Sequence, residues 1–302
     1  MNTENNYQPL VSIIMNCYNG EAYLHKSIQS VLAQTYKNWE LIFWDNRSED
    51  KSAEIFKSYE DERLKYYHAA NHTLLYGARN EAIKKSSGEF IAFLDTDDFW
   101  EKDKLDLQIP FFKDLKVGVV YSNLFIVNEK LNTKKLFLKK KKPRGFILDD
   151  LLKDYCAGLV TLVIRKSFLD KHQAFDSTFD YIGDFDLMIR MSSKYKFECV
   201  DKPIASWRSH LKNATSLKKD IQIKELKIWM KKMEDYPAIF NNKNFSNIDN
   251  KVKNLEVVSL ILDNHHKEAR FKIKKMTFSL KKIKFLIASV LPVALVKRFI
   301  QF

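Results

Sequence analysis

The sequence predicts an α/β fold: a Rossmann-like, mostly parallel sheet flanked by helices, followed by a helical, basic C-terminal extension. Three observations support this class. Apolar runs of strand length alternate with amphipathic stretches through the first half of the 302 residues. The strand-like runs are apolar at nearly every position, which is typical of parallel strands buried on both faces. The excess of positive charge lies almost entirely in the last third of the chain.

The alternating elements can be assigned in order from their spacing. Residues 11–15 are the first predicted strand. Leu24, Ile28 and Val31 share one face of the first predicted helix, residues 23–34. The same patterns predict strands at 40–44, 64–68 and 90–94, and helices at 53–59 and 76–86.

The middle of the chain is less regular. Residues 118–123 and 159–164 are predicted strands, whereas the basic run 134–142 is expected to be a solvated loop. Apolar side chains recur at helical spacing within residues 211–234. The polar, Asn-rich stretch 241–250 is the predicted linker.

The charge distribution divides the chain into two parts. Residues 1–210 contain 31 basic and 30 acidic residues, whereas residues 211–302 contain 20 basic and 8 acidic ones. We therefore expect a binding or catalytic domain of balanced charge over residues 1–215. Residues 216–302 are expected to form a helical, basic region with a separate role.

The cysteines and the N-terminus bear on the compartment. Cys17, Cys156 and Cys199 are far apart and odd in number, so they indicate neither a disulfide framework nor a zinc site. The first residues show no basic leader and no long apolar core, so no signal peptide is expected. Both observations favour a cytoplasmic location.

Polar residues follow three of the predicted strands, at residues 16–19, 45–48 and 95–98. Parallel sheets bind ligands beyond the carboxyl ends of their strands. One Asp after one strand is usually a helix cap or a turn residue. Three polar ends in one sheet converge on one crevice, and this predicts a binding site there.

The segment Asp95-Thr96-Asp97-Asp98 gathers three carboxylates, which repel each other unless a cation lies between them. Mn²⁺ or Mg²⁺ prefers carboxylate oxygen and is commonly shared with the phosphates of a nucleotide. The segment therefore predicts a metal site. The alternative is a capped turn with solvated acids, because Asp-x-Asp recurs by chance.

Several segments, in the right order and at the right separations, resemble the family 2 inverting glycosyltransferases, which have the GT-A fold. They are PLVSIIMNCYN (9–19), residues 27–50, ARNEAIKKSSGEFIAFLDTDD (78–98) and GDFDLMIR (183–190). The resemblance covers residues 7–210. It implies metal-assisted transfer of a sugar, with inversion, from a nucleoside-diphosphate sugar to a hydroxyl of a lipid-linked or growing surface glycan. UDP is the expected nucleotide.

The resemblance also implies roles for the donor site. Asn19 and Asp45 match the nucleotide pocket, with Asp45 against uracil or ribose. Arg79 matches a position near the base and ribose. Asp95 and Asp97 match the Asp-x-Asp pair, in which Asp97 is the implied direct metal ligand and Asp95 contacts both the metal and the donor.

Asp184 matches the family's catalytic base, the carboxylate that takes the proton of the acceptor hydroxyl. Asp186 is interpreted as a helix-start residue, and the alternative is that both acids only cap a helix. The family often has an acid before the base, and here Gly183 stands there. A second departure is that residues 70–80 lack the Asn-x-Gly often found before Ala-Arg-Asn.

Arg208 and His210, in Trp-Arg-Ser-His, resemble the family's basic segment near the diphosphate. On one side of an extended stretch, both could pair with phosphate charge. The alternative is a surface feature, which a lone Arg-x-His usually is.

The C-terminal segment 271–302 contains eight basic residues and no acidic one. Its apolar run 285–296 is interrupted by Pro292 and is shorter than the roughly 20 residues that a spanning helix needs. We therefore expect it to lie on an anionic membrane surface, with the protein peripheral on the inner face of the cell membrane. The alternative is a helix packed on the protein body. No nucleic-acid partner is expected, because the apolar run exceeds what a phosphate-binding strip needs.

Two functions from different classes stay open. One is a metal-dependent glycosyltransferase, and the other is a membrane-attached nucleotide-sugar-binding protein without turnover. Gly183 and the altered 70–80 loop are the only features that hint at the second. A phosphatase or nucleotidyltransferase is disfavoured, because Asn16 and Asn19 stand where a nucleophilic Asp would be needed.

Overall fold

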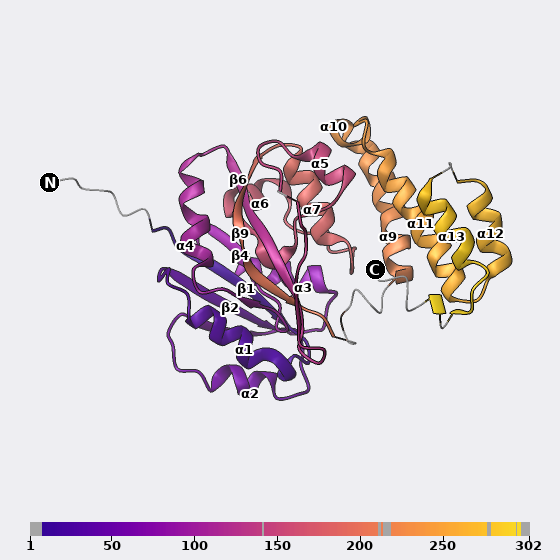
Figure 1. Cartoon of the computed structure of the whole chain (residues 1–302). Coiled ribbons are helices and arrows are strands. Elements are labelled where there is room, and N and C mark those ends of the chain that lie inside the picture. The colour runs from indigo at the N-terminus through magenta and orange to yellow at the C-terminus, as the bar shows by residue number, and fades with distance from the viewer. Residues whose placement is uncertain are drawn as a thin grey trace. The chain divides into compact units, whose positions relative to one another are not determined.

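The computed structural model describes residues 8–140, 142–210, 213, 219–276, 279–293 and 295–296. The chain forms two compact units, Met1–Asn213 and Ala214–Phe302 (Figure 1). Each unit is described by itself.

Unit 1 alternates strands and helices in its first half, as predicted. Its strands are β1 (Val11–Cys17), β2 (Trp39–Asp45), β3 (Leu64–His68), β4 (Phe90–Phe93), β5 (Phe99–Trp100), β6 (Val117–Asn128), β7 (Thr133–Leu136), β8 (Val163–Arg165) and β9 (Lys196–Arg208). Its α-helices are α1 (Glu21–Leu32), α2 (Ser52–Lys57), α3 (Leu75–Lys84), α4 (Lys104–Gln108), α5 (Leu148–Lys153), α6 (Lys166–His172) and α7 (Gly183–Ser192). Two 3₁₀ turns cover Ile109–Lys113 and Leu159–Thr161.

The described strands of unit 1 form one nine-stranded sheet of order β3-β2-β1-β4-β8-β6-β9-β5, with β7 on β6. The half that begins the chain is parallel: β1 pairs with β2 and β4, and β2 with β3. The other half is mixed. β8 runs antiparallel to both neighbours, β9 runs parallel to β6, and β5 pairs antiparallel with β9. The predicted mostly parallel α/β fold is confirmed.

The helices cover both faces of the parallel half. The chain moves from β1 through β2 to β3, then returns to β4 on the other side of β1. Because such crossovers are right-handed, the reversal puts α3 on the face opposite α1 and α2. α1 and α2 contact each other, and α3 contacts β1 and β2. Figure 1 shows α1 and α2 together on one side of these strands.

The register of the parallel strands brings their polar ends to one edge. Cys17 lies opposite Asp45, and Ile14 lies opposite Phe93. The residues that follow β1, β2 and β4 therefore emerge side by side. All seven residues of β1 are buried, and the core around them contains residues such as Ile13, Met15, Phe43 and Phe90. This packing supports the edge where the three polar segments meet.

Two predictions for the middle of unit 1 are wrong in part. Residues 159–164, predicted as a strand, begin with a 3₁₀ turn because the Thr161 N–H and hydroxyl both donate back to Gly158 O, at 2.9 and 2.7 Å. Residues 134–142, predicted as a loop, begin within β7. Lys134 and Lys135 pair there with the end of β6, where a sheet edge accommodates charged side chains.

Unit 2 is helical in its described part, residues 219–276, 279–293 and 295–296. Its elements are α9 (Lys219–Lys232), a 3₁₀ turn (Met233–Asp235), α10 (Pro237–Phe240), α11 (Ser246–Leu262), α12 (His266–Lys274) and α13 (Leu280–Ala288). α11 contacts α9 and α12. Within these ranges, every helix is too short or too polar to cross a bilayer.

The predicted linker at 241–250 is wrong. α11 begins at Ser246, and Ile248 and Val252 are buried one helical turn apart. These two apolar side chains turn an Asn-rich segment into the first turns of a packed helix. The predicted helical segment 211–234 overlaps α9, although its residues 211, 212 and 214–218 lie outside the described residues.

Candidate active site

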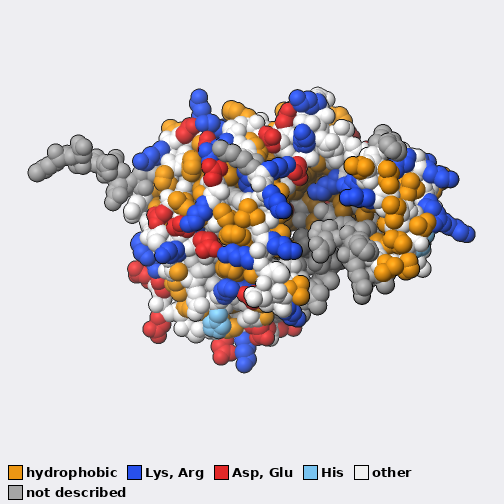
Figure 2. Space-filling model, viewed as in Figure 1, with side chains coloured by type: hydrophobic (Ala, Val, Ile, Leu, Met, Phe, Trp, Pro, Cys, Tyr) orange, Lys and Arg blue, Asp and Glu red, His pale blue; other side chains and the backbone are white. Residues whose placement is uncertain are grey.

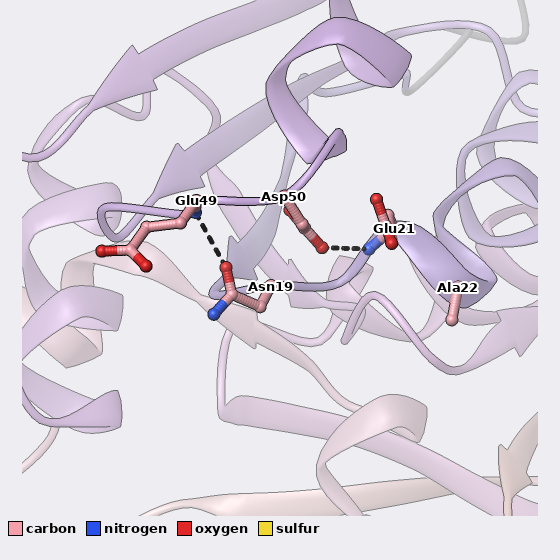
Figure 3. Close-up of a pocket in the computed structure, with 5 residues that line it drawn as sticks. All are labelled: Asn19, Glu21, Ala22, Glu49 and Asp50. Carbon is pink, nitrogen blue, oxygen red and sulfur yellow. Dashed lines mark hydrogen bonds between the residues drawn. The ribbon is translucent and has the colours of Figure 1, made fainter.

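A pocket of about 370 Å³ opens at the ends of β1 and β2, lined by Asn19, Glu21, Ala22, Glu49 and Asp50 (Figure 3). Asn19 Oδ1 accepts from the Glu49 N–H at 2.8 Å, and Asp50 Oδ2 accepts from the Glu21 N–H at 2.9 Å. Asn19 has a φ of 53°, a left-handed conformation that Asn tolerates. The pocket wall carries carboxylates, which suit hydroxyl and N–H donors such as a ribose or a base better than a phosphate.

Asp45 lies beneath this pocket loop at the end of β2 and is only 1% exposed. Its Oδ1 accepts from the Ser48 N–H at 2.7 Å, and its Oδ2 accepts from the Tyr66 hydroxyl at 2.6 Å. Burial and the Asp45 carboxylate together raise the pKa of Tyr66. Ser48 also accepts from the Asn19 N–H at 3.1 Å, so the predicted pocket residues Asn19 and Asp45 are connected through Ser48. The contact of Asp45 with a nucleotide stays a prediction.

Asn46 holds the 70–80 loop that departs from the family pattern. Its Nδ2 donates to Thr73 O at 2.9 Å, and its Oδ1 accepts from the Thr73 N–H at 3.2 Å. His72 Nδ1 lies 2.9 Å from Asn46 O. These contacts fix the loop that leads into α3 without the Asn-x-Gly sequence.

Arg79 extends from α3 to the acidic segment. It is buried, and its Nη2 donates to Asp95 Oδ1 at 2.5 Å. Burial alone would lower the pKa of Arg79, but the carboxylates of Asp95 and Asp184 help to raise it overall. Helix α3 thus contacts the segment after β4 through Arg79 and the start of α7 through Tyr76.

Asp97 faces the end of β9. Its Oδ2 lies 2.9 Å from His210 Nε2, and Asn213 Nδ2 donates to the same oxygen at 3.4 Å. Burial and the neighbouring Asp95 carboxylate raise the pKa of Asp97, while the His210 contact lowers it. The His210 ring also lies 5.0 Å from the Tyr23 ring of α1. Asp95, Asp97 and His210 therefore lie in one region.

Arg208 supports the acidic segment from within the protein. It is 2% exposed, its N–H donates to Asp98 Oδ1 at 2.9 Å, and its Nε donates to Asp97 O at 2.7 Å. Its Nη1 contacts Glu129 at the end of β6. The antiparallel pairing of Phe99 with Ser206 produces this arrangement, because it places Arg208 opposite the residues before β5. The predicted contact with phosphate stays a prediction.

Gly20 allows α1 to approach the acidic segment closely. A Cβ at Gly20 would lie 2.7 Å from Thr96 Oγ1, which is closer than real Cβ atoms come to such atoms. Ser27 Oγ lies 2.7 Å from Thr96 O and 2.6 Å from Asp98 O. The pocket loop and the acidic segment are therefore packed on the same end of α1.

Asp184 lies in the first turn of α7 and is partly buried. Its Oδ1 accepts from the Tyr76 hydroxyl at 3.1 Å. Burial raises the pKa of Asp184, and Arg79, the Phe185 N–H and Tyr76 partly offset that rise. A carboxylate with a raised pKa in a partly enclosed position is suited to accept a proton.

Asp186 differs from Asp184 in its contacts. It is buried, and its Oδ2 accepts from Arg190 Nη2 at 2.7 Å and Nε at 2.9 Å. Arg190 also donates to the carbonyl oxygens of His172, Gln173 and Ala174. Asp186 thus anchors α7 to the segment before it, which agrees with its interpretation as a helix-start residue.

The side chains of Asp95, Asp97 and His210 offer two carboxylates and an imidazole. These ligand types suit a hard divalent cation. Within the described ranges, however, no group of three or more His, Cys, Asp or Glu side chains is arranged to hold an ion. Asp95 is engaged by Arg79, and Asp97 by His210. A bound ion would have to replace or share these contacts.

Sequence reasoning missed the residues that connect these groups: Ser48, Asp50, Tyr66, Tyr76 and Asn213. Ser48 and Asp50 stand inside the segment 27–50 that carries the resemblance, so their polarity was a usable signal. Tyr76 and Asn213 carry no such signal, because each meets its partner across roughly a hundred residues of sequence.

Residues 12–195, more than half of the chain, match the family described as Glycosyl transferase family 2. The chain belongs to this family. The family 2 glycosyltransferase domain includes the pocket loop, the acidic segment and Asp184.

Two relatives of this family 2 member have names that state an acceptor or a pathway. It is 38% identical over 161 residues to the Escherichia coli UDP-Glc:alpha-D-GlcNAc-diphosphoundecaprenol beta-1,3-glucosyltransferase WfgD, covering 53% of this chain and 62% of WfgD. It is 32% identical over 163 residues to the putative teichuronic acid biosynthesis glycosyltransferase TuaG of Bacillus subtilis, covering 53% of this chain and 64% of TuaG. The chain thus spans less than two thirds of either relative.

Solved structures share the fold. S. aureus TarS 1-349 in complex with UDP-GlcNAc has a TM-score of 0.63 at 17% identity, covering 93% of this chain and 79% of that one. The mannosyltransferase PcManGT from Pyrobaculum calidifontis, in complex with GDP-Man and Mn²⁺, has a TM-score of 0.64 at 15% identity, covering 97% and 81%. The predicted GT-A fold is confirmed.

Proposed function

We propose that unit 1 is a metal-assisted inverting glycosyltransferase that uses a nucleoside-diphosphate sugar, with UDP as its nucleotide. One observation carries this proposal: helix α3 contacts both groups, because Arg79 donates to Asp95 Oδ1 at 2.5 Å and the Tyr76 hydroxyl donates to Asp184 Oδ1 at 3.1 Å. A donor held at the acidic segment would therefore present its sugar close to a carboxylate that can act as a base.

The reaction follows from the roles of these groups. Asp184 takes the proton of the acceptor hydroxyl as its oxygen attacks the anomeric carbon. The bond from the anomeric carbon to the diphosphate oxygen breaks, and the nucleoside diphosphate leaves with the electron pair. Attack from the side opposite the leaving group inverts the anomeric carbon. One carboxylate base is sufficient for this single displacement.

The nucleotide-sugar donor would extend from the pocket at the ends of β1 and β2 to the acidic segment 95–98. The carboxylate-lined pocket with Asn19 would take the ribose or base, with Asp45 beneath it. Asp97 and Asp95 would hold Mn²⁺ or Mg²⁺, which supplies positive charge to the departing diphosphate. Arg208 and His210 would contribute to the same diphosphate end, Arg208 by fixing the acidic segment from below.

The acceptor is proposed to be a lipid-linked or growing glycan of the bacterial surface. The name of WfgD describes transfer from UDP-Glc to a sugar on diphosphoundecaprenol, and TuaG is named for teichuronic acid biosynthesis. Both names support an acceptor of this class for the present chain. The name of WfgD also supports UDP as the nucleotide, as does the TarS complex with UDP-GlcNAc.

Unit 2 is proposed to hold the protein on the inner face of the cell membrane. Apolar side chains are exposed on α12, on α13 and two residues beyond α13: Phe271, Leu280, Ile283, Leu286, Ile287 and Val290. Exposed Lys281 and Lys284 alternate with them. Figure 2 shows hydrophobic and basic side chains close together on this part of the surface. Such a mixture suits an anionic bilayer surface.

The same helices also pack within unit 2. Phe285 and Ala288 are buried with Val257 and Ile261 of α11. The proposed membrane contact therefore uses the outer faces of α12 and α13. Residues 277, 278, 294 and 297–302 of the basic segment lie outside the described residues.

Incubation of the full chain with UDP-glucose, UDP-N-acetylglucosamine, UDP-galactose and GDP-mannose, with Mn²⁺ and a lipid-diphosphate-linked sugar acceptor, tests the function. We expect UDP release and transfer with at least one UDP-sugar. The Asp184→Asn variant should bind UDP as the wild type does and lose transfer by about a thousandfold, because it lacks the base. Binding of UDP without transfer or donor hydrolysis in the wild type would identify a binding protein instead.

A further inference from the structure

We propose that Tyr76 is a positioning residue for the Asp184 carboxylate, and that residue 183 must be glycine because the Tyr76 ring occupies the space of its side chain. Tyr76 lies in α3, and Gly183 and Asp184 begin α7, more than a hundred residues later. The catalytic half of this proposal rests on the proposed function of Asp184, whereas the packing half does not.

The packing between the two helices leaves no room for a side chain at position 183. A Cβ built on Gly183 would lie 2.5, 2.6 and 2.7 Å from three carbon atoms of the Tyr76 ring. Contacts under 3.0 Å are essentially never made by real Cβ atoms. The ring cannot move aside easily, because Tyr76 is 3% exposed and packs on the Phe175 ring at 5.1 Å. The backbone at the start of α7 therefore rests directly on an aromatic face.

The hydroxyl of the same ring reaches both sides of the turn into α7. Tyr76 OH lies 3.1 Å from Tyr181 O and 3.1 Å from Asp184 Oδ1. One rigid side chain thus touches the residues before and after Gly183. The hydrogen bond to Oδ1 fixes the rotation of the Asp184 carboxylate. It leaves Oδ2 as the oxygen that takes the proton of the sugar acceptor's hydroxyl.

The charge around Asp184 makes a neutral donor suitable at this place. The Asp184 carboxylate accepts a hydrogen bond from Tyr76 and interacts electrostatically with Arg79 of α3, Tyr155 after α5 and Tyr181 before α7. Arg79 is the cation among them, and its guanidinium lies 5.2 Å from the centre of the Tyr76 ring. A phenol orients the carboxylate without adding the repulsion that a second acid would bring. The tyrosine–glycine pair also accounts for the glycine that stands where the resemblance leads one to expect an acid.

The packing half is tested without any activity, by thermal unfolding of the full chain. Gly183→Ala is expected to lower Tm by about 5 °C or more, because overpacking a filled site costs roughly 1–3 kcal/mol. In the Tyr76→Ala background, adding Gly183→Ala should lower Tm by less than about 2 °C, because the ring is gone. Equal losses in the two backgrounds would overturn the pairing.

The positioning half is tested by kinetics of Tyr76→Phe, which keeps the ring and removes the hydroxyl. We expect kcat to fall about tenfold, the size of one hydrogen bond to a charged group, while KM for the donor and the Kd for UDP change less than twofold. The acidic limb of the kcat–pH profile should move to higher pH, because the lost hydrogen bond favoured the ionised base. The matched control is Tyr121→Phe, a buried tyrosine whose hydroxyl donates to Pro143 O at 2.7 Å and not to Asp184.

The outcomes separate the two proposals. An unchanged kcat and pH profile in Tyr76→Phe, with an active wild type, would overturn the positioning role and leave the glycosyltransferase function intact. A wild type that neither transfers sugar nor hydrolyses the donor would overturn the function, and with it the positioning role. The unfolding experiment would still decide whether Tyr76 and Gly183 form a matched pair.

Discussion

Arg79 Nη2 lies 2.5 Å from Asp95 Oδ1, and this contact joins α3 to the segment that follows β4. Arg79 is buried, whereas the Asp95 side chain is 39% exposed, so the cation approaches the carboxylate from the protein side. The same guanidinium lowers the pKa of Asp184. The residues proposed for donor binding and for proton transfer therefore share one cation.

Replacing this cation should alter the pH dependence of transfer. In Arg79→Met, burial of Asp184 is no longer offset by a neighbouring positive charge, so its pKa rises further. Because the base acts when ionised, the acidic limb of the kcat–pH profile should move to higher pH, and activity at pH 6 should fall more than at pH 8. Arg63→Met, which removes a partly exposed Arg–Asp pair at the other end of the sheet, should leave the profile unchanged. A profile that keeps its position in Arg79→Met would argue against this coupling.

Asp97 should control metal-dependent binding of the nucleotide. The pKa of Asp97 is raised by burial and by Asp95, so an ion placed between them would relieve repulsion. Asp97→Asn should reduce the affinity for UDP in the presence of Mn²⁺ at least tenfold and leave the weaker metal-free affinity unchanged. Titration calorimetry with and without Mn²⁺ measures both values. Asp201→Asn, at an exposed site in β9, is the control. Equal Mn²⁺ enhancement in wild type and Asp97→Asn would exclude Asp97 as a ligand.

Glu40 should stabilise the fold in a pH-dependent manner. Burial alone would raise its pKa, but hydrogen bonds from Lys65, Ser12 and the Ser87 N–H lower it overall. A lowered folded-state pKa adds stability above the unfolded-state value and loses it as the pH falls through the folded-state value. Glu40→Gln should therefore lower the free energy of unfolding at pH 7 by about 2 kcal/mol.

The difference between wild type and Glu40→Gln should shrink as the pH falls below about 4.5, near the ordinary Glu pKa. Urea denaturation at several pH values measures it. Glu81→Gln, from an exposed pair with Lys84, should change the free energy by less than about 0.5 kcal/mol. A difference in the free energy of unfolding between wild type and Glu40→Gln that stays constant down to pH 4 would contradict the role of ionised Glu40.

The outer face of α13 should determine binding to anionic membranes. Lys281→Ala combined with Lys284→Ala removes two charges, each worth about 1 kcal/mol near an anionic surface, so affinity for phosphatidylglycerol vesicles should fall roughly thirtyfold. Neutral phosphatidylcholine vesicles should bind weakly in both cases. The matched control is Lys84→Ala with Lys85→Ala, two exposed lysines at the end of α3. Loss of equal size in the control would mean that net charge, not α13, governs binding.

Local patterns were sufficient for the first half of the fold. Leu24, Ile28 and Val31 predicted α1 because helical periodicity is a property of neighbouring residues, and all three are buried. The sequence was less informative at 159–164, where a hydrogen-bonded turn at Gly158 interrupts an apolar run. It was also less informative at 134–142, where pairing with the preceding strand β6 decides the conformation of Lys134 and Lys135.

By itself, the sequence determined the order of strands and helices from β1 to β4 and the polar ends of β1, β2 and β4, because each depends on residues close together in the chain. It also indicated the family, because several such local motifs occur in a fixed order. Only the tertiary structure decided that Arg208 lies beneath Asp98, that α3 contacts both Asp95 and Asp184, and that Tyr76 fills the space beside Gly183. The contacts of Arg208 with Asp98 and of Tyr76 with Gly183 and Asp184 each join residues separated by about a hundred positions. The physical reason is that such partners are selected by strand register and helix packing, which no local pattern encodes.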